Sequence, residues 1–296
     1  MNPILNQMFL SQRNAFNKKY ENRKNTVIPP DVELIEDVSY EATNSVHKMD
    51  IFRPTDRGDN LPIIINIHGG GLILGNKEFN RLFCTRLCQQ GFVVFSIEYQ
   101  LVPDVTAFHQ FSDVIVASAY IKKYGCAYGG DTENIFMVGD SAGAYLAVYT
   151  TAMKRNPSLS VAAHNSTSGA QIRALALISG MFYTNKFDKI GLFLPRVLYG
   201  NHYKMSSFAQ YINPESEGII KNLPPCYLVT SCGDHLHNYT IDFSKALKSG
   251  GVTYQLIDYS KAQGGKQLPH AFSVFYPDLP ESRATITQIA DFFRSV

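Results

Sequence analysis

A serine at the centre of a glycine-flanked turn is the residue of this chain best suited to nucleophilic catalysis. Residues 139–143 read Gly-Asp-Ser-Ala-Gly, with strand-like residues 134–138 before them and helix-like residues 142–155 after them. Such a turn exposes the serine hydroxyl at a helix N-terminus, where free amides favour developing negative charge. An ordinary glycine-rich turn is the alternative for the five residues alone. Together with their flanks they predict Ser141 as a nucleophile for acyl transfer.

A run of three glycines upstream could stabilise the oxyanion that such a nucleophile creates. Residues 68–71 read His-Gly-Gly-Gly and follow the strand-like residues 62–68. Glycines let the backbone approach a substrate and direct its amides at the carbonyl oxygen. A flexible loop or a phosphate-binding turn is the alternative, but the segment has neither a following Lys-Ser/Thr nor G-x-G-x-x-G spacing. The predicted oxyanion hole comprises the amides of Gly70, Gly71 and Ala142.

A serine nucleophile needs a base, and the base needs a carboxylate that orients it. On a strand–turn–helix scaffold of this type the chain order is serine, then acid, then histidine. Asp234 follows the strand-like residues 226–231, and His270 follows residues 253–259 after a glycine-bearing loop. The alternatives are a helix N-cap for Asp234 and a solvated loop imidazole for His270. The order favours the pair as orienting acid and base.

Other titratable residues near these positions are weaker candidates. His235 and His237 adjoin Asp234 and could not easily reach around to Ser141. Asp258 lies within the last strand-like run, too close to the loop of His270 to orient that histidine. The predicted catalytic residues therefore stay Ser141, Asp234 and His270.

Short apolar, β-branched runs alternate with longer helical patterns along the chain. The strand-like runs span residues 46–52, 62–68, 92–99, 134–138, 173–179, 226–231 and 253–259. The helical patterns span residues 76–90, 106–124, 142–155, 239–249 and 281–295. This alternation predicts a single α/β domain over residues 1–296, with a mostly parallel central sheet flanked by helices. Two regions fall outside the alternation, about residues 1–40 and 181–222, and we expect them to contribute a small helical cap.

Composition narrows the classes of partner. The net charge is +2 and charged residues make up 18% of the 296 residues, without a basic block, so nucleic-acid binding is not expected. The N-terminus lacks a secretory signal pattern, and the apolar runs are too short to span a bilayer. The chain has five cysteines, an odd number, and they do not resemble a zinc ligand set. Free thiols are therefore predicted. A cytoplasmic protein without membrane contact and without a metal is therefore expected.

Six motifs in one order carry a resemblance to a known family. They are residues 49–54 (M-D-I-F-R-P), 68–71 (H-G-G-G), 98–104 (E-Y-Q-L-V-P-D), 139–143 (G-D-S-A-G), 233–236 (G-D-H-L) and 270–272 (H-A-F). The chain resembles the hormone-sensitive-lipase-like carboxylesterases of the α/β-hydrolase fold from about residue 46 to its C-terminus. The resemblance implies the triad and oxyanion hole above, a cap built largely from N-terminal residues and no cofactor. Dimerisation through an edge strand or the last helix is a further family-level expectation.

The sequence departs from the family pattern at three positions near these motifs. Ala144 stands where a further glycine is usual, Gln100 replaces a usual arginine, and Asn238 stands where a second acid often follows. None of these positions belongs to the predicted triad, so we expect them to affect helix packing and local ion pairs.

The expected reaction is hydrolysis of a small-molecule carboxylic ester through an acyl-enzyme. Short acyl chains are preferred because no segment suggests the interfacial anchoring of a lipase. Phe182 and Tyr183 are candidates for lining the substrate pocket, with a packed cap core as the alternative. An amidase or arylformamidase, or a small-peptide hydrolase, would use the same triad. A non-catalytic ligand-binding protein of this fold is disfavoured because all three triad residue types are present.

Overall fold

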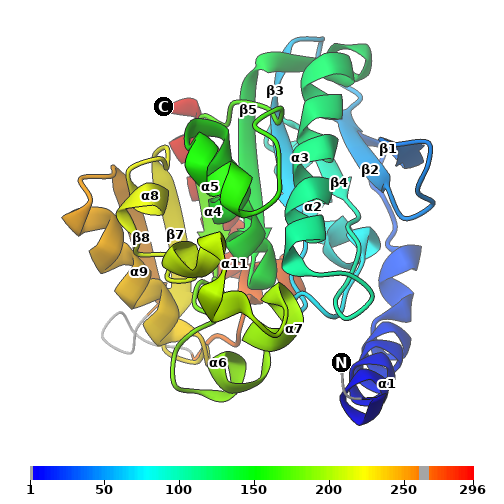
Figure 1. Ribbon diagram of the computed structural model, residues 1–296. Helices are drawn as coiled ribbons and strands as arrows, with labels where there is room; N and C mark the ends of the chain where they lie inside the picture. Colours follow the sequence, from blue (N-terminus) through cyan, green and yellow to red (C-terminus); the bar gives the residue numbers. More distant parts are fainter. Residues whose placement is uncertain (1–2, 260–266) are drawn as a thin grey trace.

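The protein is built on one mostly parallel sheet, seen in a computed structural model that describes residues 3–259 and 267–296 (Figure 1). The described residues form eight strands in the order β1-β2-β4-β3-β5-β6-β7-β8. These are β1 (Val32–Ser39), β2 (Lys48–Pro54), β3 (Leu61–Ile67), β4 (Val93–Ile97), β5 (Gly130–Asp140), β6 (Leu175–Ile178), β7 (Cys226–Ser231) and β8 (Tyr254–Tyr259). β2 pairs antiparallel with β1 and with β4, and the remaining neighbours are parallel. The predicted α/β-hydrolase fold is confirmed.

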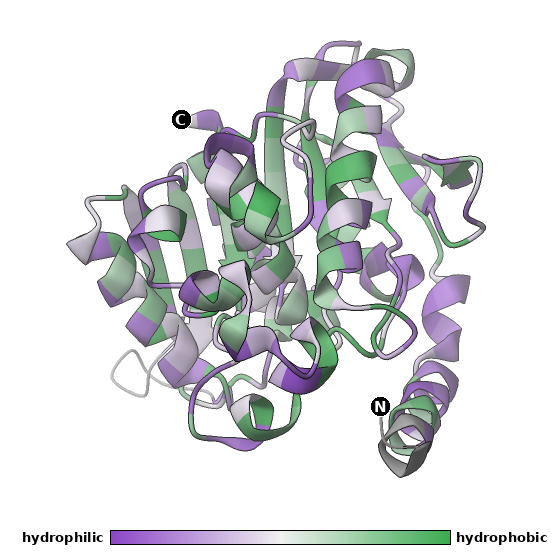
Figure 2. Cartoon of the chain, viewed as in Figure 1, coloured by the Kyte–Doolittle hydropathy of each residue, from purple (hydrophilic) through white to green (hydrophobic). Residues whose placement is uncertain are grey.

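The central strands are apolar on both faces because helices cover both sides of the sheet. Ile63 and Ile65 of β3 enter one hydrophobic core, whereas Ile64 between them enters the other. All three are fully buried. Figure 2 shows the same distribution, with hydrophobic colour along the inner strands and hydrophilic colour concentrated on outer helices and loops.

Helices form a layer on each face of the sheet. The α-helices are α1 (Pro3–Lys19), α2 (Arg81–Gln89), α3 (Ala107–Tyr124), α4 (Ala142–Arg155), α5 (Pro157–Ala162), α6 (Lys189–Phe193), α7 (Pro195–Tyr199), α8 (Glu217–Ile220), α9 (His237–Ser249), α10 (Phe272–Phe275) and α11 (Pro280–Arg294). Apolar residues of α3, α4 and α9 belong to one core, and those of α2 and α11 belong to the other. The predicted helices and strands therefore exist, with boundaries that differ by a few residues.

The carboxyl ends of the parallel strands bring the predicted site segments to one edge of the sheet. β3 and β5 are neighbours in register, with Ile67 opposite Gly139, so residues 68–71 and Ser141 leave the sheet side by side. β7 ends three residues before Asp234. Ligands of open α/β sheets bind at this edge.

The N-terminal region departs from the expectation that residues 1–40 belong to a cap. Residues 32–39 form β1, an edge strand that pairs with β2, so this part of the range belongs to the sheet. Its charged residues hid the strand from sequence analysis, although charges are common on edge strands. Ahead of it, α1 lies at the lower right of Figure 1, beside the body of the molecule.

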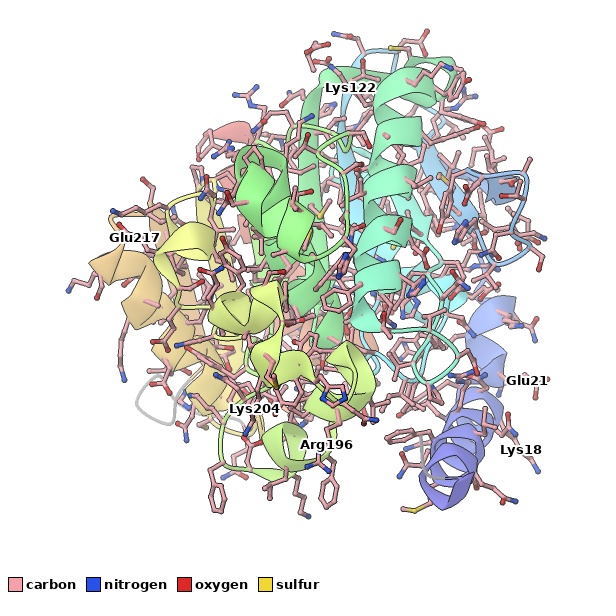
Figure 3. The ribbon with its side chains drawn as sticks, in the orientation of Figure 1. Lys18, Glu21, Lys122, Arg196, Lys204 and Glu217 are labelled. Carbon is pink, nitrogen blue, oxygen red and sulfur yellow. The ribbon has the colours of Figure 1, made fainter. Side chains whose placement is uncertain are left out.

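The surface carries cations and anions from many elements. In Figure 3 the labelled side chains lie at the periphery, Lys18 on α1, Lys122 on α3 and Glu217 on α8 among them. Lys122 pairs with Glu133 and Glu217 pairs with Lys221. None of the helices in the described ranges combines the length and apolar character needed to cross a membrane.

Candidate active site

Ser141 occupies a strained turn between β5 and α4. Its backbone has φ 49° and ψ −114°, a region that non-glycine residues rarely adopt. Two hydrogen bonds hold the turn, from the Ser141 amide to the Ile178 carbonyl at 2.8 Å and from the Met181 amide to the Ser141 carbonyl at 2.9 Å. The side chain is mostly buried, since the residue is 8% exposed. The turn therefore presents one hydroxyl in a fixed place at the start of a helix.

The glycines on either side of Ser141 are required by close packing. A Cβ atom on Gly143 would overlap the carbonyl oxygen of Ile67, the last residue of β3. A Cβ atom on Gly139 would lie 2.5 Å from the backbone of Gly143. The G-x-S-x-G spacing thus lets β5, the turn and the first turn of α4 pack directly against β3.

The glycine loop that follows β3 crosses beside the Ser141 turn. A Cβ atom on Gly69 would lie 3.1 Å from that of Ser141, so the two segments touch. Gly70 and Gly71 have φ of 119° and 63°, which favour glycine. The amides of Gly70 and Gly71 donate no hydrogen bond within the described chain, and Ala142, as the first residue of α4, has an amide without an intrahelical acceptor. These amides could serve an incoming oxyanion.

A buried carboxylate, Asp140, joins the two loops and was not singled out from the sequence. Its Oδ1 accepts from the Gly69 amide at 3.0 Å and from Asn80 Nδ2 at 2.8 Å. Burial raises the pKa of Asp140, although the Asn80 hydrogen bond opposes that change. The aspartate inside the G-D-S-A-G motif was the available signal, but its partner Asn80 lies 60 residues earlier in the chain.

Asp234 and His270 meet at the opposite side of the site. His270 Nδ1 lies 2.7 Å from Asp234 Oδ1, which also accepts from the Leu236 amide at 2.8 Å. Burial alone would raise the pKa of Asp234, but the hydrogen bond and the charge of His270 outweigh it, and the net change is downward. Asp234 is therefore an ionised partner that can orient the imidazole.

The loop that carries His270 is attached to β6 through a serine. The Ala271 amide donates to Ser179 Oγ at 3.0 Å, and Ala271 itself has φ 48°. Ser179 directly follows Ile178, whose carbonyl holds the Ser141 amide. The two sides of the site thus share one anchor at the end of β6. Ser141 and His270 themselves make no hydrogen bond to each other in the described structure, as is frequent before substrate binds.

The neighbouring titratable residues divide into two groups. His237 Nε2 lies 3.0 Å from Asp258 Oδ2, so these two residues form their own pair away from His270. His235 instead lies beside His270, with ring centroids 4.4 Å apart. Asp234, His235 and His270 are the described residues grouped closely enough to hold a metal ion. Sequence analysis set His235 aside as a base and did not consider it as a ligand.

Phe182 and Tyr183 lie in the packed interior. The Phe182 ring stacks on Phe243 of α9 at 4.1 Å, and Tyr183 makes an edge contact with Tyr239 at 5.1 Å. The two residues are 1% and 2% exposed. The described contacts therefore match the packed core that was the alternative for both rings, and the pocket-lining role stays a prediction.

Two arginines of the N-terminal segment contact the site loops, and sequence analysis did not identify either. Arg13 donates to the carbonyls of Ile73 and Val102 at 2.9 and 2.8 Å. Arg23 donates to the carbonyls of Phe79 and Phe275 at 2.8 Å each. Phe275 belongs to α10, which begins two residues after His270. Arginines in a polar N-terminal segment carry no sequence signal for such distant partners.

A known protein family matches the part of the chain that carries most of this site. The family model described as BD-FAE matches residues 49–247, about two thirds of the chain. The chain belongs to the BD-FAE family. This match spans β2 to α9 and includes the glycine loop, Ser141 and Asp234, and the recognition of a hormone-sensitive-lipase-like esterase fold is confirmed.

Curated relatives of this BD-FAE chain are named as esterases. A probable isoprenylcysteine alpha-carbonyl methylesterase of Oryza sativa subsp. japonica is 28% identical over 80% of this chain and 62% of its own length. The versiconal hemiacetal acetate esterase of Dothistroma septosporum is 24% identical over 77% of this chain and 71% of its own length. The chain thus spans about three fifths of the first of these relatives.

Solved structures share the fold along nearly the whole chain. Esterase B from Lactobacillus rhamnosis has a TM-score of 0.86 at 24% identity, covering 98% of this chain and 95% of its own. A hyperthermophilic esterase from Pyrobaculum calidifontis has a TM-score of 0.71 at 26% identity, covering 100% of this chain and 98% of its own. The α/β-hydrolase architecture is therefore shared with experimentally determined esterases.

Proposed function

We propose that this protein is a serine carboxylesterase that cleaves small, uncharged esters through an acyl-enzyme. The observation that carries the proposal is the convergence at one sheet edge of a strained serine, unpaired loop amides and a histidine hydrogen-bonded to a buried carboxylate. Nucleophilic acyl transfer uses these three elements together. Membership of the BD-FAE family and the esterase names of its relatives support the same reaction.

In the proposed acylation step, His270 Nε2 accepts the Ser141 proton while Ser141 Oγ attacks the ester carbonyl. The amides of Gly70, Gly71 and Ala142 donate to the tetrahedral oxyanion, and removing one such donor typically costs about 10²–10³ in rate. His270 then protonates the leaving alcohol. Asp234 keeps the Nδ1 proton in place and stabilises the imidazolium.

Deacylation repeats the sequence with water as the nucleophile. His270 Nε2 accepts a proton from water, the hydroxide attacks the acyl carbonyl, and the same amides hold the second oxyanion. Ser141 leaves with its proton restored. No step in this cycle draws on a cofactor or a metal.

We place the preferred substrates among esters in which at least one side is short. The names of the two relatives refer to a methyl ester and to an acetate ester, and esterase B has been solved with a C4-C4 tributyrin phosphonate. A clear preference for long-chain esters over butyrate-length ones would overturn this part of the proposal.

We propose that residues 3–31 and 181–222 form the cap over this edge. In Figure 1, α6 and α7 lie at the lower end of the molecule, beyond the carboxyl ends of the parallel strands, and α1 lies to their right. Arg13 and Arg23 support the assignment because they tie the N-terminal part to loops of the site. Dimerisation and a cytoplasmic location remain predictions from the sequence and the family.

The experiment that tests the function compares this protein with Ser141→Ala on a short-chain aryl ester. We expect rapid hydrolysis by the wild type and a loss of several orders of magnitude in the variant. A matched aryl amide distinguishes an esterase from an amidase or arylformamidase, which would cleave the amide comparably. Equal trace rates in both proteins would instead favour a ligand-binding protein.

A further inference from the structure

Three metal-ligating side chains meet at the base side of the site. His270 Nδ1 lies 2.7 Å from Asp234 Oδ1, and His235 Nδ1 lies 3.8 Å from the same oxygen. One ligand atom from each of the three residues lies within 4.8 Å of the other two. Two imidazole nitrogens and one carboxylate oxygen form the three-ligand donor set that proteins use for Zn²⁺ with an open fourth position.

The observed separations suit a tetrahedral ion after small movements. Zinc–ligand bonds of about 2.0–2.1 Å place tetrahedral ligands roughly 3.3 Å apart. The 2.7 Å contact must therefore lengthen and the 3.8 Å contact must shorten, each by roughly half an ångström. His235 can make this adjustment because its side chain is 68% exposed; among the described residues its ring lies against the His270 imidazole in a tilted contact. The same exposure gives an ion access from solvent.

We propose that Asp234, His235 and His270 form a binding site for Zn²⁺. The bound ion inhibits the enzyme and takes no part in the reaction. Two nitrogen donors favour Zn²⁺ over Mg²⁺ and Ca²⁺, which prefer oxygen ligands.

Inhibition follows from the tautomer that such an ion enforces, and this step rests on the proposed function of His270. An ion on Nδ1 occupies the lone pair of that nitrogen, so the single proton of the neutral ring resides on Nε2. One proton moves from Nδ1 to Nε2, and no electron is transferred. Nε2 then has no lone pair with which to accept the Ser141 proton. Zinc therefore removes the base while leaving the nucleophile and the oxyanion loop intact.

A binding experiment tests the site without relying on hydrolysis. The full-length Ser141→Ala protein is titrated with Zn²⁺ by calorimetry and compared with Ser141→Ala/His235→Gln. We expect one ion per chain in the first and at least about tenfold weaker binding in the second, since even outer-shell losses cost about 10–100-fold. His109→Gln, which removes an exposed histidine of α3 outside the cap and the three-residue cluster, is the matched control and keeps the first affinity. Equal affinity with and without His235 would overturn the site.

An activity experiment then tests the inhibition. The wild type is expected to lose ester hydrolysis in Zn²⁺ and to recover it in EDTA, whereas Mg²⁺ has no effect. His235→Gln should need at least about tenfold more zinc, each rate being compared with that protein's own zinc-free rate. Unchanged zinc sensitivity in His235→Gln would contradict the mechanism. Absence of hydrolysis before zinc is added would overturn the proposed function alone, because the calorimetric comparison still decides the metal site.

Discussion

The two sides of the site are assembled in different ways. On the nucleophile side, β3, β5 and α4 contact one another through glycine backbone, and no side chain could be added at Gly69 or Gly143 without a clash. On the base side, His270 is held by two contacts with side chains distant in sequence. Its Nδ1 lies against Asp234, and the amide of the next residue, Ala271, donates to Ser179 Oγ. The proposed nucleophile, Ser141, is thus positioned by backbone packing, whereas the proposed base, His270, is positioned by a few polar contacts that single substitutions can remove.

Removing the charge of Asp234 should have the largest effect on the base side. Asp234→Asn keeps the size of the side chain, but its amide group can donate to Nδ1 and thereby stabilise the tautomer with the proton on Nε2. We expect kcat to fall on the order of 10⁴-fold, as for other triads of this kind. Steady-state kinetics on a short-chain aryl ester measure the loss, and circular dichroism checks the fold. A loss below tenfold would assign the orienting role elsewhere.

Adding one methyl group tests the nucleophile side. In Gly69→Ala the new Cβ would lie 2.9 Å from the Asp140 carbonyl oxygen and would overlap the Asp140 carboxylate. The oxyanion loop must therefore move, and we expect kcat/KM to fall by about 10²–10³, the usual cost of a lost oxyanion donor. Gly58→Ala is the control, because a Cβ atom there meets nothing within 4 Å. Equal activity of the two variants would refute backbone packing as the determinant.

The anchor shared by the two sides should give an intermediate effect. Ser179→Ala removes the acceptor of the Ala271 amide and leaves that buried donor unpaired, which costs about 1–3 kcal/mol. We expect kcat to fall about tenfold with little change in KM, because the base rather than the binding pocket is displaced. Titration of active protein with a phosphonate ester separates this effect from a loss of folded protein. A normal kcat per active chain would show that the anchor only stabilises the fold.

Substitutions of the two N-terminal arginines should have the smallest effects on kcat, and the difference between the two effects compares the two sides of the site directly. Arg23 contacts α10 next to the base, whereas Arg13 contacts the loop beyond the glycines. Arg23→Lys keeps the charge but loses the paired hydrogen bonds, and we expect about 1 kcal/mol less transition-state stabilisation, roughly a fivefold lower kcat. Arg13→Lys should change kcat by less than twofold, since backbone packing already fixes its side. A larger effect for Arg13 than for Arg23 would reverse the comparison.

The same contrast explains how much the sequence could predict. The Ser141 turn and its helix depend on local residues, and α4 begins and ends at the predicted positions. The order of the strands' carboxyl ends was enough to select Asp234 and His270 as candidates. The first prediction needs only one short segment, and the second needs only the order of residues along the chain.

What the sequence could not supply depends on partners distant in the chain. Phe182 and Tyr183 are apolar enough for a pocket or a core, and only their contacts with α9 distinguish the two. The role of Asn80 requires the position of Asp140, and that of Ser179 requires the position of Ala271. The edge strand β1 escaped notice because its charged residues interrupt the apolar alternation of a typical strand.

The backbone of Ser141 has a consequence for the evolution of this protein. A side chain held at φ 49° and ψ −114° costs of order 1–3 kcal/mol, and glycine would avoid most of that cost. Substitution by glycine would therefore raise stability while it abolished the chemistry. Selection for stability and selection for activity therefore favour different residues at this position, and the presence of serine means that the fold is less stable here than the sequence could make it.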